Sequence, residues 1–217
     1  MNLQKDKNVL VVVGGWNPAI VLNPKWLKKY IFPAQNQFQF ELEFVSSQQP
    51  LACIRVDNLV ISLPGNRLCF ARKTDDAAQY DVIQDIACKF ADFLPHTPVE
   101  AYGVNFVFET TIGDRSFMNR DTILYKSLAA KTGNIKEEHS IYSITLAHGT
   151  LNLTAKERPM VVGGKSLQLE FNFHHEISDL GQLKAGLDET KILEHFVYAR
   201  DFAQEIENQL ASTAEQK

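Results

Sequence analysis

The densest group of polar side chains with chemical potential lies between residues 172 and 179, where the sequence reads Asn-Phe-His-His-Glu-Ile-Ser-Asp. The alternation of apolar and polar residues before it predicts a β-strand, whose successive side chains point to opposite faces. Asn172, His174 and Glu176 would then share one face, and His175 would point to the other. Imidazole and carboxylate groups on one face are the ligand types that zinc and similar metal ions prefer.

A metal or catalytic site at this cluster would need Asp179 or His195 to complete the set of ligands. The HExxH spacing is absent, and no cysteine lies near in sequence. The alternative interpretation is a strand end that emerges into solvent. We therefore keep Asn172, His174, Glu176 and His195 as candidate binding residues, and we predict no resident metal and no cofactor.

Two glycine pairs suggest phosphate binding, but the residues around them argue against it. Gly14-Gly15 follows a β-branched run, whereas a dinucleotide fingerprint needs the spacing G-x-G-x-x-G leading directly into a helix. Residues 163–166, Gly-Gly-Lys-Ser, imitate the end of a P-loop, but the first glycine of that motif would fall at Pro159. We predict a strand-ending turn at Gly14-Gly15, a strand directly after Gly163-Gly164, and no phosphate site at either place.

The three cysteines, Cys53, Cys69 and Cys88, are separated in sequence, and each lies in an apolar pattern. Such residues are typical of reduced, buried thiols in a cytosolic protein. The chain begins with a polar segment, and the apolar run at 9–13 is too short for a signal core or a membrane span. We therefore expect a cytoplasmic protein with no membrane association.

The 217 residues carry a formal net charge of −4, with 45% hydrophobic and 22% charged residues. These values are typical of a soluble globular protein and provide no basic stripe for nucleic acid. Lys25, Lys28 and Lys29 form a small basic face beside Trp26 and Tyr30. A solvated helix face explains these lysines better, so nucleic-acid binding is the least favoured function.

Periodicity of apolar residues predicts the same order of elements in each half of the chain. The central element is the strand at 99–109, where the side chains of even-numbered residues are almost all apolar. Before it we expect a strand at 9–13, a short helix after Pro24, strands between 38 and 71, and a helix at 76–94. After it we expect a helix at 119–131, strands at 141–147, 150–155 and 166–173, a loop bracketed by Gly181 and Gly186, and a helix at 188–210.

Each half thus reads strand, short helix, several antiparallel strands, long helix. We predict a single α+β domain at 1–210 with a mainly antiparallel sheet and the long helices packed on it. The two halves, at about 8–95 and 99–210, are expected to be similar units, and 211–217 a flexible tail.

Three short motifs carry a resemblance to a known family. They are Arg-Leu-Cys-Phe at 67–70 after a hairpin turn, Gly-Val-Asn-Phe at 103–106 in the central strand, and Leu-Glu-His-Phe at 193–196 with Phe202 in the last helix. With the order of elements, they make the chain resemble a sporadically distributed family of uncharacterised bacterial proteins built from two α+β halves. The resemblance implies this fold, a cytoplasmic location and a bacterial source, and it carries over no catalytic residue.

The sequence contains no G-x-S-x-G elbow or other specific catalytic constellation. This favours a non-catalytic binding or protein-interaction module over an enzyme. The alternative is an enzyme with its site around His174 and Glu176, and a metal-dependent mechanism is one form of this alternative.

We also expect a two-fold homodimer, because closed two-fold dimers are the commonest soluble assembly. The strand Phe38–Val45 carries four apolar side chains and has no proline or lysine to discourage edge pairing. Tyr198 lies outside the main apolar stripe of the last helix. In the alternative interpretation, the other half of the same chain covers both features.

Overall fold

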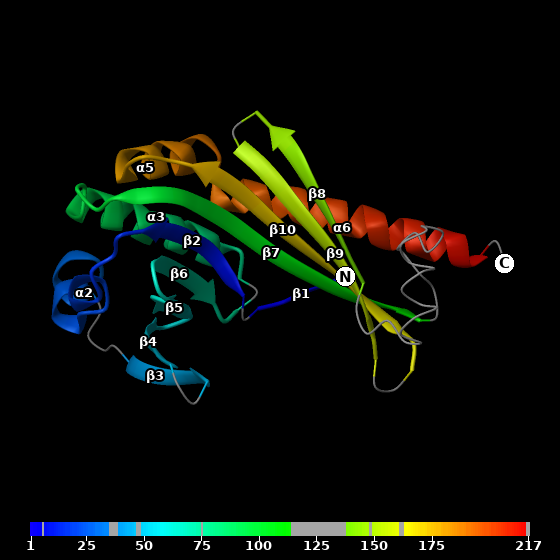
Figure 1. Ribbon diagram of the computed structural model, residues 1–217, viewed down its shortest axis with the longest axis horizontal. Coiled ribbons are helices and arrows are strands. Elements are labelled where there is room, and N and C mark those ends of the chain that lie inside the picture. Colours follow the sequence, from blue (N-terminus) through cyan, green and yellow to red (C-terminus); the bar gives the residue numbers. More distant parts are fainter. Residues whose placement is uncertain are drawn as a thin grey trace, which may run out of the picture.

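The computed structural model describes residues 1–217 apart from positions 6, 35–38, 47–48, 75, 114–137, 148, 161–162 and 216–217. Figure 1 shows the arrangement of its strands and helices. In chain order they are β1 (Asn2–Leu3), β2 (Asn8–Gly14), α1 (Pro18–Val21), α2 (Pro24–Tyr30), β3 (Gln39–Ser46), β4 (Gln49–Val56), β5 (Leu59–Ser62), β6 (Arg67–Arg72), α3 (Ala78–Phe93), β7 (Val99–Gly113), β8 (Glu138–Leu146), β9 (Gly149–Pro159), β10 (Lys165–Glu176), α5 (Leu180–Glu189) and α6 (Ile192–Glu215).

The described strands form one sheet in the order β3-β4-β5-β6-β2-β7-β10-β9-β8. Outside this order, β1 pairs with residues 108–109 of β7. Every neighbouring pair is antiparallel. The central strand is β7, which pairs with β2 on one side and with β10 on the other. The mainly antiparallel α+β architecture predicted from periodicity is therefore confirmed.

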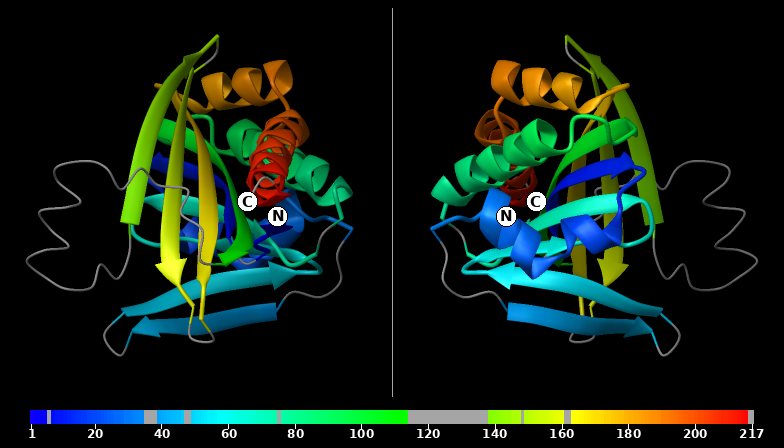
Figure 2. Two further views of the ribbon diagram at one scale, coloured as in Figure 1. Left: turned by 90° about the vertical axis from the view of Figure 1, so that its right-hand side faces the viewer. Right: turned by 90° about the vertical axis from the view of Figure 1, so that its left-hand side faces the viewer.

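The helices cover one face of this sheet, and the hydrophobic core lies between the two layers (Figure 2). Alternation along β7 directs the buried side chains of Tyr102 and Phe106 toward the helices. The ring of Phe106 lies 5.7 Å from that of Tyr80 in α3 and 5.5 Å from that of Phe196 in α6, measured between centroids. These aromatic contacts fix both long helices to the central strand.

In the order from β3 to β8, the described strands number five on the β2 side of the β2–β7 pairing and four on the β7 side, and the predicted similarity of the two halves stays a prediction. In each half the first strand lies beside the last one, β2 beside β6 and β7 beside β10, and the intervening strands continue outward to β3 and β8. The short helix predicted at 119–131 lies outside the described residues. Whether the halves arose by duplication stays a prediction of the sequence.

The loop predicted between Gly181 and Gly186 is wrong, because residues 180–189 form the helix α5. The side chain of Asp179 caps the helix by accepting a hydrogen bond from the backbone N–H of Gln182 at 2.9 Å. Leucines at 180, 183 and 187 are buried on one side of the helix. This capped, one-sided pattern outweighs the low helix propensity of glycine.

The last helix begins at Ile192 and extends to Glu215, so it includes residues that we assigned to a tail. It lies along β7 and β10, with Phe202 in edge contact with Phe171 at 5.8 Å between ring centroids. Strand β8 forms the margin of the sheet beyond this helix (Figure 2). No helix in the described part of the chain has the length and apolar character needed to cross a membrane.

Candidate functional site

The face of the sheet opposite the helices carries a ladder of amide side chains across four strands. Asn172 donates to Asn105 at 2.7 Å and accepts from Asn152 at 3.3 Å, and Ser143 donates to Asn152 at 2.8 Å. Antiparallel register places Asn105, Asn172, Asn152 and Ser143 directly opposite one another in turn. A Cβ atom at Gly103 would lie 2.7 Å from the Asn172 amide nitrogen, so glycine leaves room for the ladder. The hydrogen-bonding capacity of Asn172 is thus largely used within the fold.

The structure places the other candidate residues on both sides of the sheet. His174 follows Asn172 on the open face of β10, and Glu176 is exposed at the end of that strand. His195 lies in α6, on the helix-covered side, where it packs against Phe173 with 4.3 Å between ring centroids. The fold therefore separates His195 from Asn172 and His174.

The histidine that His195 does meet is His175, which our pattern directed away from the candidate set. Their ring centroids are 5.6 Å apart, and His175 in turn stacks on Tyr102 at 4.4 Å with the ring planes 3° apart. Burial, and secondarily the charge of His175, lowers the pKa of His195 to about 4. His195 is therefore neutral at physiological pH.

A metal site is not assembled from these residues. Among the residues that the structure describes, no three histidine, cysteine, aspartate or glutamate side chains are grouped so as to hold a metal ion. None of Cys53, Cys69 and Cys88 forms a disulfide. Burial raises the pKa of Cys69 and of Cys88 to about 11, so these thiols are protonated and poorly nucleophilic.

Each of the two glycine pairs lies at the end of a strand. Gly15 follows β2 and donates its backbone N–H to the carbonyl of Pro98 at 2.8 Å. Gly163 and Gly164 have positive φ angles of 91° and 77° immediately before β10, a conformation that glycine adopts without strain. The next residue, Lys165, is ion-paired with Glu157 at 3.2 Å. Gly163 and Gly164 thus lie at the turn between β9 and β10, and the residues after them form a strand, as the sequence predicted.

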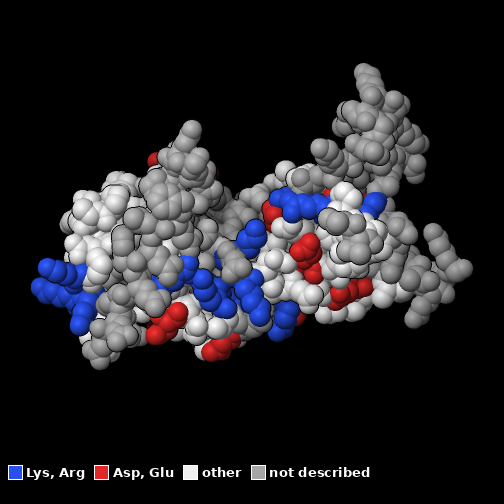
Figure 3. All heavy atoms as spheres, turned by 90° about the horizontal axis from the view of Figure 1, so that it is seen from below, with Lys and Arg blue, Asp and Glu red and all other residues white. Residues whose placement is uncertain are grey.

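Basic side chains on the surface seen in Figure 3 form an interrupted row, with acidic side chains beside them. Two lysines of β9 and β10 are already ion-paired, Lys156 with Glu170 at 2.6 Å and Lys165 with Glu157. In α2, the ammonium group of Lys29 lies 4.8 Å from the centre of the Tyr30 ring. These contacts suit a solvated mixed-charge surface.

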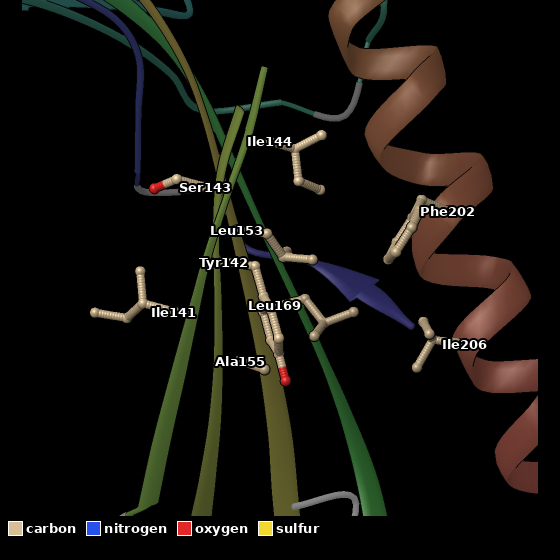
Figure 4. A pocket seen from close by; sticks show the side chains of 9 residues that line it. All are labelled: Ile141, Tyr142, Ser143, Ile144, Leu153, Ala155, Leu169, Phe202 and Ile206. Carbon is tan, nitrogen blue, oxygen red and sulfur yellow. The ribbon is translucent and has the colours of Figure 1, made fainter. Parts of the chain in front are cut away.

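The most distinctive surface is an apolar groove between the β8 margin of the sheet and α6. Its volume is about 590 Å³. Figure 4 shows Ile144, Leu153 and Leu169 of the sheet directed toward Phe202 and Ile206 of α6. Tyr142 and Ala155 also line the groove, whereas Ile141 and Ser143 border it with side chains directed away from α6 (Figure 4). No lining residue carries a charge.

The strand beside this groove has an unusual edge. Residues 140–147 contain no charged residue and no proline, the usual devices that protect an edge strand. Ile141, Tyr142 and Ile144 are 70%, 52% and 40% exposed. Within the described residues, β8 pairs with β9 alone, so its outer backbone groups face away from the sheet. Sequence analysis found this strand but missed that it is a margin, because strand order depends on long-range pairing.

Comparisons with protein-family models, curated proteins and solved structures found no match. The family resemblance drawn from short motifs therefore stays a prediction.

Proposed function

We propose that the protein is a non-catalytic interaction module that binds an extended strand along β8, and that β8 of a second copy supplies this strand. The observation that carries the proposal is the uncharged stretch of β8 at residues 140–146 together with the apolar groove beside it. A bound strand would pair with the outward backbone groups and cover the exposed apolar side chains.

The chemistry of the edge selects the kind of occupant. Outward N–H and C=O groups along a strand are satisfied as a continuous row by another strand. The uncharged lining of the groove favours apolar side chains, since a charged group placed there would lose solvation without gaining a partner. The occupant is therefore an extended, uncharged segment.

Residues 140–146 of β8 meet this description themselves. Antiparallel pairing about Ser143 places Tyr142 of one copy opposite Ile144 of its partner on the groove side. The same register places Ile141 opposite Thr145 on the other face. An apolar cross-strand pair such as Tyr142 with Ile144 contributes about 0.2–1 kcal/mol. The strand is thus self-complementary, as a two-fold interface requires.

The homodimer edge predicted at 38–45 is less suitable than β8. Strand β3 does lie at the opposite margin of the described sheet, but it contains Glu41 and Glu43. Like charges near one another across a two-fold pairing oppose association. Tyr198 also has a partner within the chain, because its ring meets Phe173 at 5.8 Å in an edge contact.

Light scattering and sedimentation of the full chain test the proposal. We expect a mass that rises with concentration from 24.5 kDa toward twice that value. Ile144→Lys should shift the equilibrium toward monomer by at least about tenfold, since it places a charge at the centre of the interface. The matched control is Val82→Lys in α3, because Val82 and Ile144 are equally exposed at 40%.

Two outcomes would overturn the proposal. The first is a wild-type mass that stays at 24.5 kDa up to millimolar concentration. The second is a dimer that persists in Ile144→Lys, because the interface would then lie elsewhere. Circular dichroism of each variant checks that the fold is kept.

We also propose the cytoplasmic location and bacterial source that the sequence resemblance implies. Free, protonated thiols at Cys69 and Cys88 support a reducing compartment.

A further inference from the structure

A second, polar pocket lies at the end of the sheet where β7 and β10 meet α5. Its volume is about 270 Å³, near the lower end of small-molecule sites. It is far smaller and more polar than the groove beside β8. The lining residues are Tyr102, His175, Glu176, Ile177, Gln182, Ala185, Gly186 and Glu189.

The base of this pocket is Tyr102, which is only 2% exposed. Its ring is held in register by parallel stacking on His175, the residue opposite it in the β7–β10 pairing. Its hydroxyl lies against Gly186, and a Cβ atom at that position would overlap it. Glycine in the middle of α5 therefore keeps the space around the hydroxyl open.

The Tyr102 hydroxyl makes no hydrogen bond with any other described residue, although the pocket reaches it. The hydroxyl is not itself sealed from solvent, so a ligand in the pocket can reach it. Burial, with a smaller contribution from the negative charge of Glu189, raises the pKa of Tyr102 to about 12. The phenol is therefore neutral at physiological pH, and its oxygen can accept a hydrogen bond from a ligand.

The charge of the pocket selects the sign of that ligand. Glu176 and Glu189 contribute two exposed carboxylates, and the lining contains no lysine or arginine. An ammonium or guanidinium group would pair with these carboxylates and donate to the phenolic oxygen. A metal ion is less suitable, because no group of three metal-ligating side chains exists among the described residues.

We propose that this pocket binds a small organic cation, with Tyr102 accepting a hydrogen bond from its ammonium or guanidinium group and Glu189 balancing its charge. The site is independent of the β8 edge. Glu176, which the sequence placed among the candidate binding residues, contributes the second carboxylate.

Calorimetric titration with agmatine tests the proposal, because this probe carries a guanidinium and an ammonium on a short chain. We expect saturable binding that weakens as salt is added. Glu189→Gln should weaken binding about tenfold, and Tyr102→Phe about fivefold. The matched control is Glu205→Gln, which removes an exposed carboxylate of α6 outside the pocket.

A neutral probe of similar chain length, 1-butanol, should not bind. The proposal would be overturned by a lack of saturable agmatine binding at millimolar concentration. Equal weakening in Glu189→Gln and Glu205→Gln would also overturn it, since attraction would then come from overall charge. Thermal unfolding of Tyr102→Phe shows whether a loss of binding comes from a loss of fold.

Discussion

The hydroxyl of Tyr102 occupies the space in which residue 186 would carry a Cβ atom. Gly186 lies in the interior of α5, where glycine is less favourable than alanine by about 1 kcal/mol. The close approach of β7 and α5 at this point therefore depends on a residue that weakens the helix locally.

This relationship predicts a sign change in a double-mutant cycle. Gly186→Ala should lower the free energy of unfolding by about 1–3 kcal/mol, because the added methyl group overlaps the hydroxyl. In the Tyr102→Phe background the same change should be neutral or stabilising, since the nearest remaining ring atom lies 3.2 Å from the new Cβ. Urea denaturation of the four proteins measures the coupling.

Gly181→Ala, in the first turn of α5, provides the control for this cycle. Its Cβ would meet the side chain of Asp179 and not Tyr102, so its effect should be the same in both backgrounds. Equal costs of Gly186→Ala in the two backgrounds would contradict the assigned overlap.

Arg72 is a buried cation held by aromatic rings. Its guanidinium lies 4.4 Å from the centre of the Tyr80 ring and 5.9 Å from that of Phe196, and it donates to the carbonyl of Thr74 at 2.8 Å. Arg72→Lys should destabilise the protein by about 2 kcal/mol, because an ammonium cannot keep both the stacking and the hydrogen bond.

Arg72→Met should cost less than Arg72→Lys, since methionine packs on the Tyr80 ring without burying a charge. Chemical denaturation compares the two variants. Arg200→Met, at an exposed position of α6, is the control and should change stability by less than about 0.5 kcal/mol. A larger loss for methionine than for lysine at position 72 would contradict this account.

Burial of His195 leads us to expect that the free energy of unfolding falls as the pH becomes acidic. Its pKa is lowered to about 4 in the folded state, against about 6.5 for an exposed histidine. The unfolded chain therefore binds the additional proton between these values. The stabilisation from neutral His195 is complete above pH 6.5 and is lost as the pH falls toward 4, by about 3 kcal/mol in total.

His195→Gln should flatten this part of the pH profile. Unfolding free energies measured between pH 4 and 7.5 for wild type and variant give the difference, in which the titration of unrelated carboxylates cancels. His96→Gln, at an exposed position between α3 and β7, is the control for the removal of a histidine elsewhere in the chain. Parallel profiles for wild type and His195→Gln would show that His195 titrates normally in the folded protein.

Periodicity identified most of the strands and the face that each one buries. The alternation at 99–109 correctly placed Tyr102 and Phe106 on the core side of the central strand. The alternation before residue 172 correctly predicted that the side chains of Asn172 and His175 point to opposite faces of β10. The local pattern does not show which strands are neighbours in the sheet. The amide ladder and the position of β8 at the margin therefore could not be predicted from it.

The helix α5 was missed for a related reason. Its two glycines weaken the local signal, and the stabilising contacts are the tertiary burial of Leu180, Leu183 and Leu187. Asn172, His174 and Glu176 were chosen because they are neighbours in one strand, and His195 because it is a histidine. The fold does not bring all four side chains to one site. Only Glu176 lines the polar pocket, and Tyr102 gave no sign of its role because its partners are distant in sequence.

The amide ladder predicts a specific loss of stability at its centre. Asn172→Ala removes the hydrogen bonds to Asn105 and Asn152, and the half-buried amides left behind regain only part of their hydration. We expect a cost of about 1–2 kcal/mol, measured by urea denaturation. Thr154→Val on the same face of β9 keeps the branched shape outside the ladder and should cost less than about 0.5 kcal/mol. A coupling of at least about 0.5 kcal/mol between Asn172→Ala and Asn105→Ala would identify the ladder as the source, whereas additive effects would assign the loss to strand propensity alone.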